Sequence, residues 1–180
     1  MTIEAMLLGL VGANVRLVVI GGVAATLHGS AYITNDLDLC YDAEPDNIER
    51  LARVLHGWHA YLYGVEPGLP CTMDAQAIRT NPVLTLITDH GRIDVMDRVA
   101  GVGDYAACLR ASEEMPFEGT RVRTLSLDAL IIARRAAART KDLARVLELE
   151  ALYAKLHGRE PPRVREPTRR PRRSRGRGRA

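Results

Sequence analysis

Two glycines at the end of a short apolar segment, followed at a distance by two aspartates, constrain this chain more than any other feature. The segment Val18-Val19-Ile20-Gly21-Gly22 is followed, after thirteen residues, by Asp36-Leu37-Asp38-Leu39. Residues two positions apart in a β-strand lie on the same face, so the two aspartates point together while the intervening leucines point to the core. The sequence therefore predicts a strand that presents a pair of carboxylates.

This aspartate pair has two interpretations. Adjacent carboxylates repel each other, and local desolvation would favour keeping one of them protonated. A divalent cation removes that conflict, because Mg²⁺ prefers hard oxygen ligands and commonly bridges carboxylates to substrate phosphates. The alternative is a half-exposed edge strand with solvated aspartates, and the Asp-x-Asp pattern alone does not decide between the two.

A third carboxylate comes from a strand predicted independently. Asp94 lies between Ile93 and Val95, two branched residues that face a core, within the predicted strand 92–97. If this strand is a neighbour of the first, three carboxylates would meet at one place. Such a group can hold two metal ions, the arrangement used for in-line phosphoryl or nucleotidyl displacement.

The two glycines also have two interpretations. Gly21 and Gly22 mark the turn from a buried strand into a helical stretch. Glycine lets the backbone approach a phosphate closely, and the N-terminus of the following helix favours an anion. The alternative is a simple tight turn. The Gly-Gly pair alone is weak evidence for a phosphate site; its sequence distance to the two aspartates is what supports that interpretation.

Helix and strand patterns alternate along the rest of the chain. Apolar periodicity and capping residues predict helices at 3–13, after Gly22 through residue 28, at 46–57, from Ser126 to about 139, and from Thr140 to about 156. Short apolar segments predict strands at 17–20, 37–41, 83–88 and 92–97, the last two forming a hairpin, while 61–81 reads as mostly loop. We therefore expect an α/β (α+β) fold, a mixed sheet flanked by helices, with a C-terminal helical segment.

Charge divides the chain into two parts. Residues 159–180 contain ten arginines and two glutamates, a local charge of +8, which leaves −5 on residues 1–158 out of the formal +3 of the whole chain. The C-terminal part also has four of the nine prolines and no apolar periodicity. We expect one domain at 1–158 and a disordered, basic Arg/Pro-rich tail at 159–180. The tail has no aromatic residue to stack on bases, so any contact with nucleic acid would be electrostatic.

Several classes of protein are not expected. No apolar run approaches the ~20 residues of a transmembrane helix, and the first residues lack the features of a signal peptide. The three cysteines form no CxxC pair and no zinc pattern, which argues against a disulfide scaffold or a structural metal. We expect a cytoplasmic protein that does not contact a membrane.

Together the motifs resemble the DNA polymerase β-type nucleotidyltransferase superfamily, in which an apolar residue and Gly-Gly precede an Asp-x-Asp strand and a later strand carries a third Asp. The chain is most similar to the small members, the minimal nucleotidyltransferases and toxin-like relatives of the AbiEii type. The similarity extends over residues 17–153 and rests on the Gly21–Gly29 segment, Thr34, Asp36, Asp38 and the segments 66–70, 84–86, 91–94 and 139–143.

This resemblance implies an Mg²⁺-dependent (or Mn²⁺-dependent) transfer of a nucleoside monophosphate from an NTP to an acceptor hydroxyl. The implied metal ligands and catalytic residues are Asp36, Asp38 and Asp94, the last as a metal ligand or as the base, and the implied nucleotide-binding residues are Gly21, Gly22, Thr34 and Lys141. Lys141 has an alternative interpretation as an exposed residue balanced by Asp142, and His28 either contacts the nucleotide or caps the first helix after the glycines.

Two residues depart from the pattern that the resemblance leads us to expect. Tyr32 occupies the place of an arginine, and Arg134 occupies the place of a lysine. Both changes affect phosphate-binding cations and therefore bear on nucleotide affinity more than on metal binding.

The acceptor is open: it can be RNA, a protein side chain or a small molecule, and ATP is one of the candidate NTPs. The alternative function is a non-catalytic module that binds nucleotide or nucleic acid, as one half of a toxin–antitoxin pair. The three carboxylates favour the enzyme, whereas Tyr32 favours the alternative, which would have an antitoxin as its partner.

Overall fold

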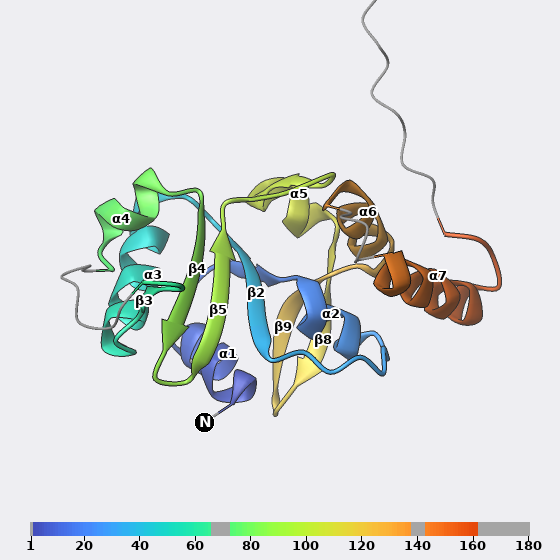
Figure 1. The fold of residues 1–180 in the computed structure, drawn as a ribbon, viewed down its shortest axis with the longest axis horizontal. Helices are drawn as coiled ribbons and strands as arrows, with labels where there is room; N and C mark the ends of the chain where they lie inside the picture. The colour runs from blue at the N-terminus through green and yellow to red at the C-terminus, as the bar shows by residue number, and fades with distance from the viewer. Residues whose placement is uncertain (1, 66–72, 138–142, 162–180) are drawn as a thin grey trace, which may run out of the picture.

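A mixed β-sheet forms the centre of the computed structural model, which describes residues 2–65, 73–137 and 143–161 (Figure 1). Seven strands of the described chain form this sheet in the order β3-β4-β5-β2-β1-β9-β8. Their bounds are Leu17–Val19 (β1), Asp36–Tyr41 (β2), Tyr61–Leu62 (β3), Val83–Thr88 (β4), Gly91–Met96 (β5), Ser112–Phe117 (β8) and Thr120–Leu125 (β9). A second, two-stranded sheet pairs β6 (Arg98–Val99) with β7 (Gly103–Asp104).

Helices cover both faces of the large sheet. They are α1 (Ile3–Gly12), α2 (Gly21–Leu27), α3 (Pro45–Gly57), α4 (Ala75–Thr80), α5 (Tyr105–Arg110), α6 (Leu127–Ala137) and α7 (Leu143–His157). Helix α1 packs against β2 and α3, and both helices lie behind the sheet in Figure 1, whereas α2 lies in front of it and packs against α6, which packs against α7. This is the expected mixed sheet flanked by helices, with a helical C-terminal part.

The antiparallel pairing of β1 with β2 explains why the glycines and the aspartates meet. Val19 pairs with Leu39, and the backbone N–H of Ile20 donates to the carbonyl of Asp38 at 3.0 Å. The C-terminal end of β1 therefore lies beside the N-terminal end of β2. The thirteen residues between the two motifs form α2 and the loop that returns the chain to this point.

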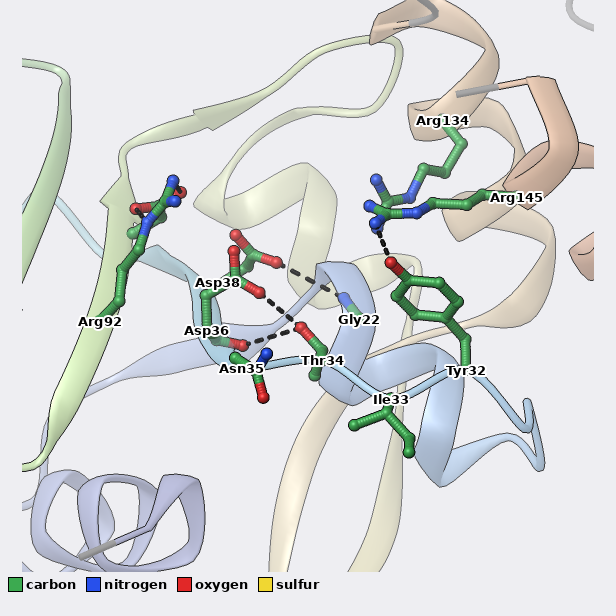
Figure 2. A pocket seen from close by; sticks show the side chains of 11 residues that line it. Gly22, Tyr32, Ile33, Thr34, Asn35, Asp36, Asp38, Arg92, Arg134 and Arg145 are labelled. Carbon is green, nitrogen blue, oxygen red and sulfur yellow. Dashed lines mark hydrogen bonds and ion pairs between the residues drawn. The ribbon is translucent and has the colours of Figure 1, made fainter. Parts of the chain in front are cut away.

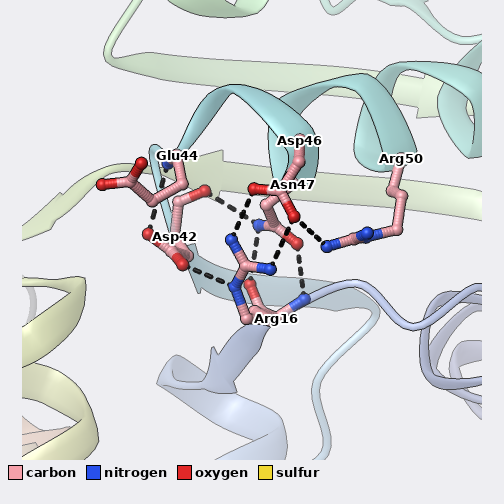
Figure 3. Close-up of polar contacts among 6 residues, drawn as sticks. All are labelled: Arg16, Asp42, Glu44, Asp46, Asn47 and Arg50. Atoms are coloured by element: carbon pink, nitrogen blue, oxygen red, sulfur yellow. Dashed lines mark hydrogen bonds and ion pairs between the residues drawn. The ribbon is translucent and has the colours of Figure 1, made fainter.

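A buried asparagine holds the other end of this strand pair (Figure 3). The side chain of Asn47 is fully buried; its Oδ1 accepts from the backbone N–H of Arg16 at 2.7 Å, and its amide donates to the carbonyls of Arg16 and Asp42 at 3.0 and 2.8 Å. Around it, the Arg16 guanidinium pairs with Asp42 at 2.6 Å and with Asp46 at 2.8 Å. These contacts join the start of β1 to the start of α3 and support the β1–β2 register.

Most predicted elements are present. The predicted helices at 3–13 and 46–57, the strands at 17–20, 37–41, 83–88 and 92–97 and the hairpin are confirmed within one or two residues. Ser126 caps α6, because its hydroxyl accepts from the backbone N–H of Ala129 at 3.4 Å. The helix from about 140 to 156 corresponds to α7, while Thr140, the residue expected to cap it, lies outside the described residues.

Two regions differ from the expectation. The stretch 61–81 is not mostly loop where it is described, since it contains β3 and α4, and Asp74 caps α4 by accepting from the N–H of Ala77 at 2.8 Å. The hairpin of β8 and β9 and the helix α5 were not predicted at all. Strand β8 is charged and contains Pro116, which the sheet tolerates because β8 is its edge strand. No helix within the described residues has the length and apolar character to cross a membrane.

Candidate functional site

Three carboxylates converge on one face of the sheet, where β2 and β5 run parallel (Figure 2). Asp38 pairs directly with Asp94 across the two strands, and Asp36 lies two residues before Asp38 on the same face. One carboxylate oxygen from each of the three lies within 4.8 Å of the others. The predicted neighbourhood of Asp94 with Asp36 and Asp38 is therefore present in the structure.

Burial and the negative charges of its two neighbours both act on the carboxyl of Asp38. Burial raises the pKa of Asp38 to about 6, and the negative charges of Asp36 and Asp94 act in the same direction. The backbone N–H of Gly22, which donates to Asp38 Oδ2 at 3.4 Å, and the charge of Arg134 act to lower the pKa of Asp38. A hard divalent cation would offset this repulsion, so the donor set fits Mg²⁺ or Mn²⁺.

The two glycines accommodate neighbouring side chains. Gly21 has φ +63°, and a Cβ built on it would lie 1.9 Å from Asp38 Oδ2; a Cβ on Gly22 would lie 2.6 Å from the Thr34 side chain. Both positions therefore exclude a side chain. Gly22 lines the cleft above the carboxylates, whereas Gly21 lies against Asp38 and is not part of that lining.

Thr34 orients the first carboxylate. Its hydroxyl donates to Asp36 Oδ1 at 2.5 Å, and the residue lines the same cleft. A metal-binding carboxylate is held in one orientation when a residue that does not itself bind the metal donates a hydrogen bond to it. Thr34 therefore acts on Asp36 in the structure, in addition to its predicted place at the nucleotide.

The third carboxylate pairs with an arginine of its own strand. Arg92 Nη2 lies 3.1 Å from Asp94 Oδ2, and its guanidinium stacks over the ring of Tyr63 at 4.9 Å from the ring centroid. Arg92 shares the face of Asp94 because it lies two residues before it, and it lines the cleft. The same period-two pattern that placed Asp36 beside Asp38 would have placed Arg92 in the site.

Two further arginines form the opposite wall of the cleft. Arg134 comes from α6 and Arg145 from α7, and Figure 2 shows their guanidinium groups next to each other, facing the side of the carboxylates. Within the described residues neither guanidinium has a carboxylate partner; Arg145 donates to the hydroxyl of Tyr32. Together with Ile33 and Asn35, these residues complete a cleft of about 510 Å³.

Two predicted residues stand apart from this cleft. Lys141 lies outside the described residues. His28 occupies the C-cap position of α2, where its Nε2 lies 2.9 Å from the carbonyl of Leu125, and it is not among the residues that line the cleft. Arg145 has no sequence signal of its own, because it is more than one hundred residues from the other cleft residues of the Gly-Gly and Asp-x-Asp segment.

Solved structures of other proteins share the fold of this chain. The lincosamide antibiotic adenylyltransferase LnuA, solved with lincomycin bound, is similar over 84% of this chain and 98% of its own, with a TM-score of 0.54 at 13% sequence identity. The antibiotic-resistance factor ANT(2″)-Ia is similar over 87% of this chain and 89% of its own, with a TM-score of 0.50 at 16% identity. The fold is that of a nucleotidyltransferase.

This nucleotidyltransferase fold is the part of the resemblance that the structures support. Neither a protein-family model nor a curated protein matches the sequence. The narrower similarity to minimal nucleotidyltransferases and AbiEii-type toxins therefore stays a prediction. In the nucleotidyltransferase fold of this chain, the acidic cluster and the two arginines face each other across one cleft between β2, β5, α6 and α7.

Proposed function

We propose that this chain is a metal-dependent nucleotidyltransferase that moves a nucleoside monophosphate from an NTP to an acceptor hydroxyl. One observation carries the proposal: Asp36, Asp38 and Asp94 lie within 4.8 Å of one another on one side of a cleft whose other side carries Arg134 and Arg145. The carboxylates suit a divalent cation and the arginines suit phosphate oxygens, and a metal-bound triphosphate needs both kinds of group next to each other.

The carboxylates would hold the metal, Mg²⁺ or Mn²⁺. When bound, such an ion lowers the pKa of an attacking hydroxyl and neutralises negative charge on a leaving pyrophosphate. Asp38 would gain from such an ion, since the ion would remove the repulsion that helps to raise the pKa of Asp38. Thr34 fixes the orientation of Asp36, and Gly21 leaves room for the carboxylate of Asp38.

The reaction is an in-line displacement at the α-phosphorus. The acceptor oxygen forms a bond to this phosphorus, the bond to the bridging oxygen of the β-phosphate breaks, and pyrophosphate leaves with the electron pair. Asp94 would either bind the metal or take the proton of the hydroxyl, and Arg92, which pairs with Asp94, would keep its carboxylate aligned. Arg134 would neutralise phosphate charge from the opposite wall, and Gly22, Thr34 and Lys141 are the other proposed nucleotide contacts.

The acceptor class is RNA, a protein or a small molecule. LnuA was solved with lincomycin, which makes hydroxylated antibiotics the first small molecules to test. A toxin-like role with an antitoxin partner, in the cytoplasm, is the narrower version of the same proposal. The basic tail at 159–180 would then support an RNA acceptor.

A transfer assay tests the proposal. The protein is incubated with each α-³²P-labelled NTP, Mg²⁺ or Mn²⁺, and total RNA, total protein or a panel of hydroxylated antibiotics. We expect label on one acceptor class with the wild type and none with Asp38→Asn. NTP binding without transfer to any acceptor would instead favour the non-catalytic binding module, for which Tyr32 in place of an arginine is the supporting observation.

A further inference from the structure

Tyr32 and Arg145 form a pair on one wall of the cleft, although they come from two distant parts of the chain. Tyr32 lies in the loop between α2 and β2, and Arg145 lies in the first turn of α7. The guanidinium of Arg145 stacks over the Tyr32 ring at 4.3 Å from its centroid and also donates to the Tyr32 hydroxyl. The ring and hydroxyl of Tyr32 therefore hold the half-buried side chain of Arg145 in one place.

The loop that carries Tyr32 is itself fixed. The backbone N–H of Tyr32 donates to the Ser30 hydroxyl at 3.1 Å, and the Tyr32 carbonyl accepts from the hydroxyl of Thr26 at 3.2 Å. The buried Ser30 hydroxyl also donates to Glu148 at 2.5 Å, one turn along α7 from Arg145. The contacts of Ser30 and Tyr32 thus bind the loop and α7 together.

Arg145 is placed to bind an anion, because within the part of the chain that the structure describes its guanidinium has no carboxylate partner. Its neighbour on the same wall, Arg134, forms no ion pair with a carboxylate among the described residues, although its charge acts on Asp38. An arginine already held in position loses little side-chain entropy when it binds, and guanidinium groups suit phosphate oxygens well.

We propose that Arg145, positioned by Tyr32, binds the terminal phosphates of the NTP. This inference rests on the proposed function, which puts the reacting α-phosphate at the carboxylates. The β- and γ-phosphates then extend away from the acidic wall, toward the two arginines. Tyr32 is a positioning residue in this arrangement, because it acts on the phosphates through Arg145.

Binding of inorganic tripolyphosphate in the presence of Mg²⁺, measured by isothermal titration, tests this assignment without depending on the base or the acceptor. We expect Arg145→Ala to bind at least about tenfold more weakly, the effect of losing a charged hydrogen bond. Tyr32→Phe keeps the ring but loses the hydroxyl, and we expect a loss of roughly threefold. An arginine at position 32 would bring a guanidinium to the same wall of the cleft from the loop between α2 and β2. The double variant Arg145→Ala/Tyr32→Arg is therefore expected to recover an affinity for tripolyphosphate within about threefold of the wild type.

Arg159→Ala is the matched control. Arg159 also lies over a tyrosine ring, 6.0 Å from the centroid of Tyr153, and it does not line the cleft. We expect Arg159→Ala to bind tripolyphosphate with the affinity of the wild type. We also expect Mg²⁺ alone to stabilise Arg145→Ala as much as it stabilises the wild type. The inference is overturned if the wild type does not bind tripolyphosphate, if Arg145→Ala binds as well as the wild type, or if Arg159→Ala loses as much affinity as Arg145→Ala. A chain that binds tripolyphosphate through Arg145 but transfers no nucleotide would refute the proposed function alone.

Discussion

Gly21 and Asp38 occupy adjoining space so closely that a single methyl group at position 21 would overlap the carboxylate of Asp38. The distance from the added Cβ to Asp38 Oδ2 would be 1.9 Å, and Gly21 has a left-handed backbone with φ +63°. The glycine is therefore part of how the acidic cluster is built, whether or not its backbone also contacts phosphate. The glycine at position 21 therefore has a direct steric cause in the structure.

The first prediction is that Gly21→Ala loses the response to metal. The substitution adds left-handed strain, about 1–3 kcal/mol, and also displaces the carboxylate of Asp38. We expect lower stability and no increase in melting temperature on adding Mg²⁺, measured by thermal unfolding. Gly29→Ala is the control, because Gly29 has φ +98° with nothing within 4 Å of an added Cβ. It should lose stability yet keep the metal response; an equal response in both variants would contradict the prediction.

The second prediction concerns Asp38→Asn and pH. Because the pKa of Asp38 is raised to about 6 in the folded state, its carboxyl favours folding when protonated, and this contribution is lost as the pH rises from about 4 to about 6. We therefore expect the variant, in chelator at pH 7.5, to be more stable than the wild type by about 1–2 kcal/mol. Near pH 3.5 the two should be equally stable.

The same substitution should abolish stabilisation by Mg²⁺, which acts on the wild type through binding to the folded state. Wild-type affinity for Mg²⁺ should also fall as the pH is lowered through about 6, since protons compete for Asp38. Asp97→Asn, outside the acidic cluster, is the control for removing one carboxylate. A less stable Asp38→Asn at pH 7.5, or one that still responds fully to metal, would refute the three-carboxylate site.

The third prediction is that Thr34→Val weakens metal binding without unfolding the protein. Valine keeps the shape of threonine but removes the hydroxyl that donates to Asp36 at 2.5 Å. We expect Mn²⁺ affinity, measured by titration calorimetry, to fall by roughly tenfold. Thr80→Val removes a hydroxyl that donates to carbonyls of α4 and accepts from the side chain of Asn81; Thr80 does not line the cleft, so the affinity should be unchanged. Equal affinities for Thr34→Val and the wild type would show that Asp36 needs no support from Thr34.

The fourth prediction concerns acid unfolding and the cluster around Asn47. Hydrogen bonding to Arg16 lowers the pKa of Asp46 to about 2, so its contribution to stability is present above about pH 4 and is lost as the pH falls toward 2. We expect denaturant titrations of Asp46→Asn to show a smaller loss of stability between pH 4 and pH 2 than those of the wild type. Glu118→Gln, in the turn between β8 and β9, should follow the wild type. Parallel curves for all three proteins would exclude a role for Asp46.

The fifth prediction separates the tail from the chemistry. Deleting residues 159–180, which carry +8, should leave the binding of Mg²⁺ and NTP unchanged, because the proposed ligands all precede residue 159. If RNA is the acceptor, the deletion should raise the KM for RNA and flatten its dependence on salt, since fewer counterions are released. A small-molecule acceptor should show neither effect. Loss of NTP binding on truncation would mean that the tail takes part in the site.

The sequence predicted the acidic side of the site because that side depends on local patterns. Asp36 and Asp38 share a face by strand periodicity, and Asp94 lies in a hairpin marked by its own turn. What the patterns could not supply was the register that sets Asp94 directly opposite Asp38. The resemblance implied only a third aspartate on a later strand, and the parallel pairing of β2 with β5 supplies the register.

On the basic side, Arg134 was identified through the resemblance as standing in the place of a lysine, whereas Arg92 and Arg145 were missed for different reasons. Arg92 could have been found, since it lies two residues before Asp94 on the same strand. Arg145 could not, because only the packing of α7 against the loop at Tyr32 brings it to the cleft. The β8–β9 hairpin did carry a signal, the two-residue turn Glu118-Gly119, where both residues have positive φ of 43° and 79°.

The parallel pairing of β2 with β5 also has a consequence for how the protein forms during synthesis. Two strands in parallel that are separated by α3, α4, β3 and β4 cannot pair until all of these have been made, and such distant contacts form slowly. A nascent chain released only as far as α3 would carry Asp36 and Asp38 without Asp94. Metal binding by all three carboxylates would therefore require β5 to have paired with β2, and it would provide a direct way to follow that step of folding.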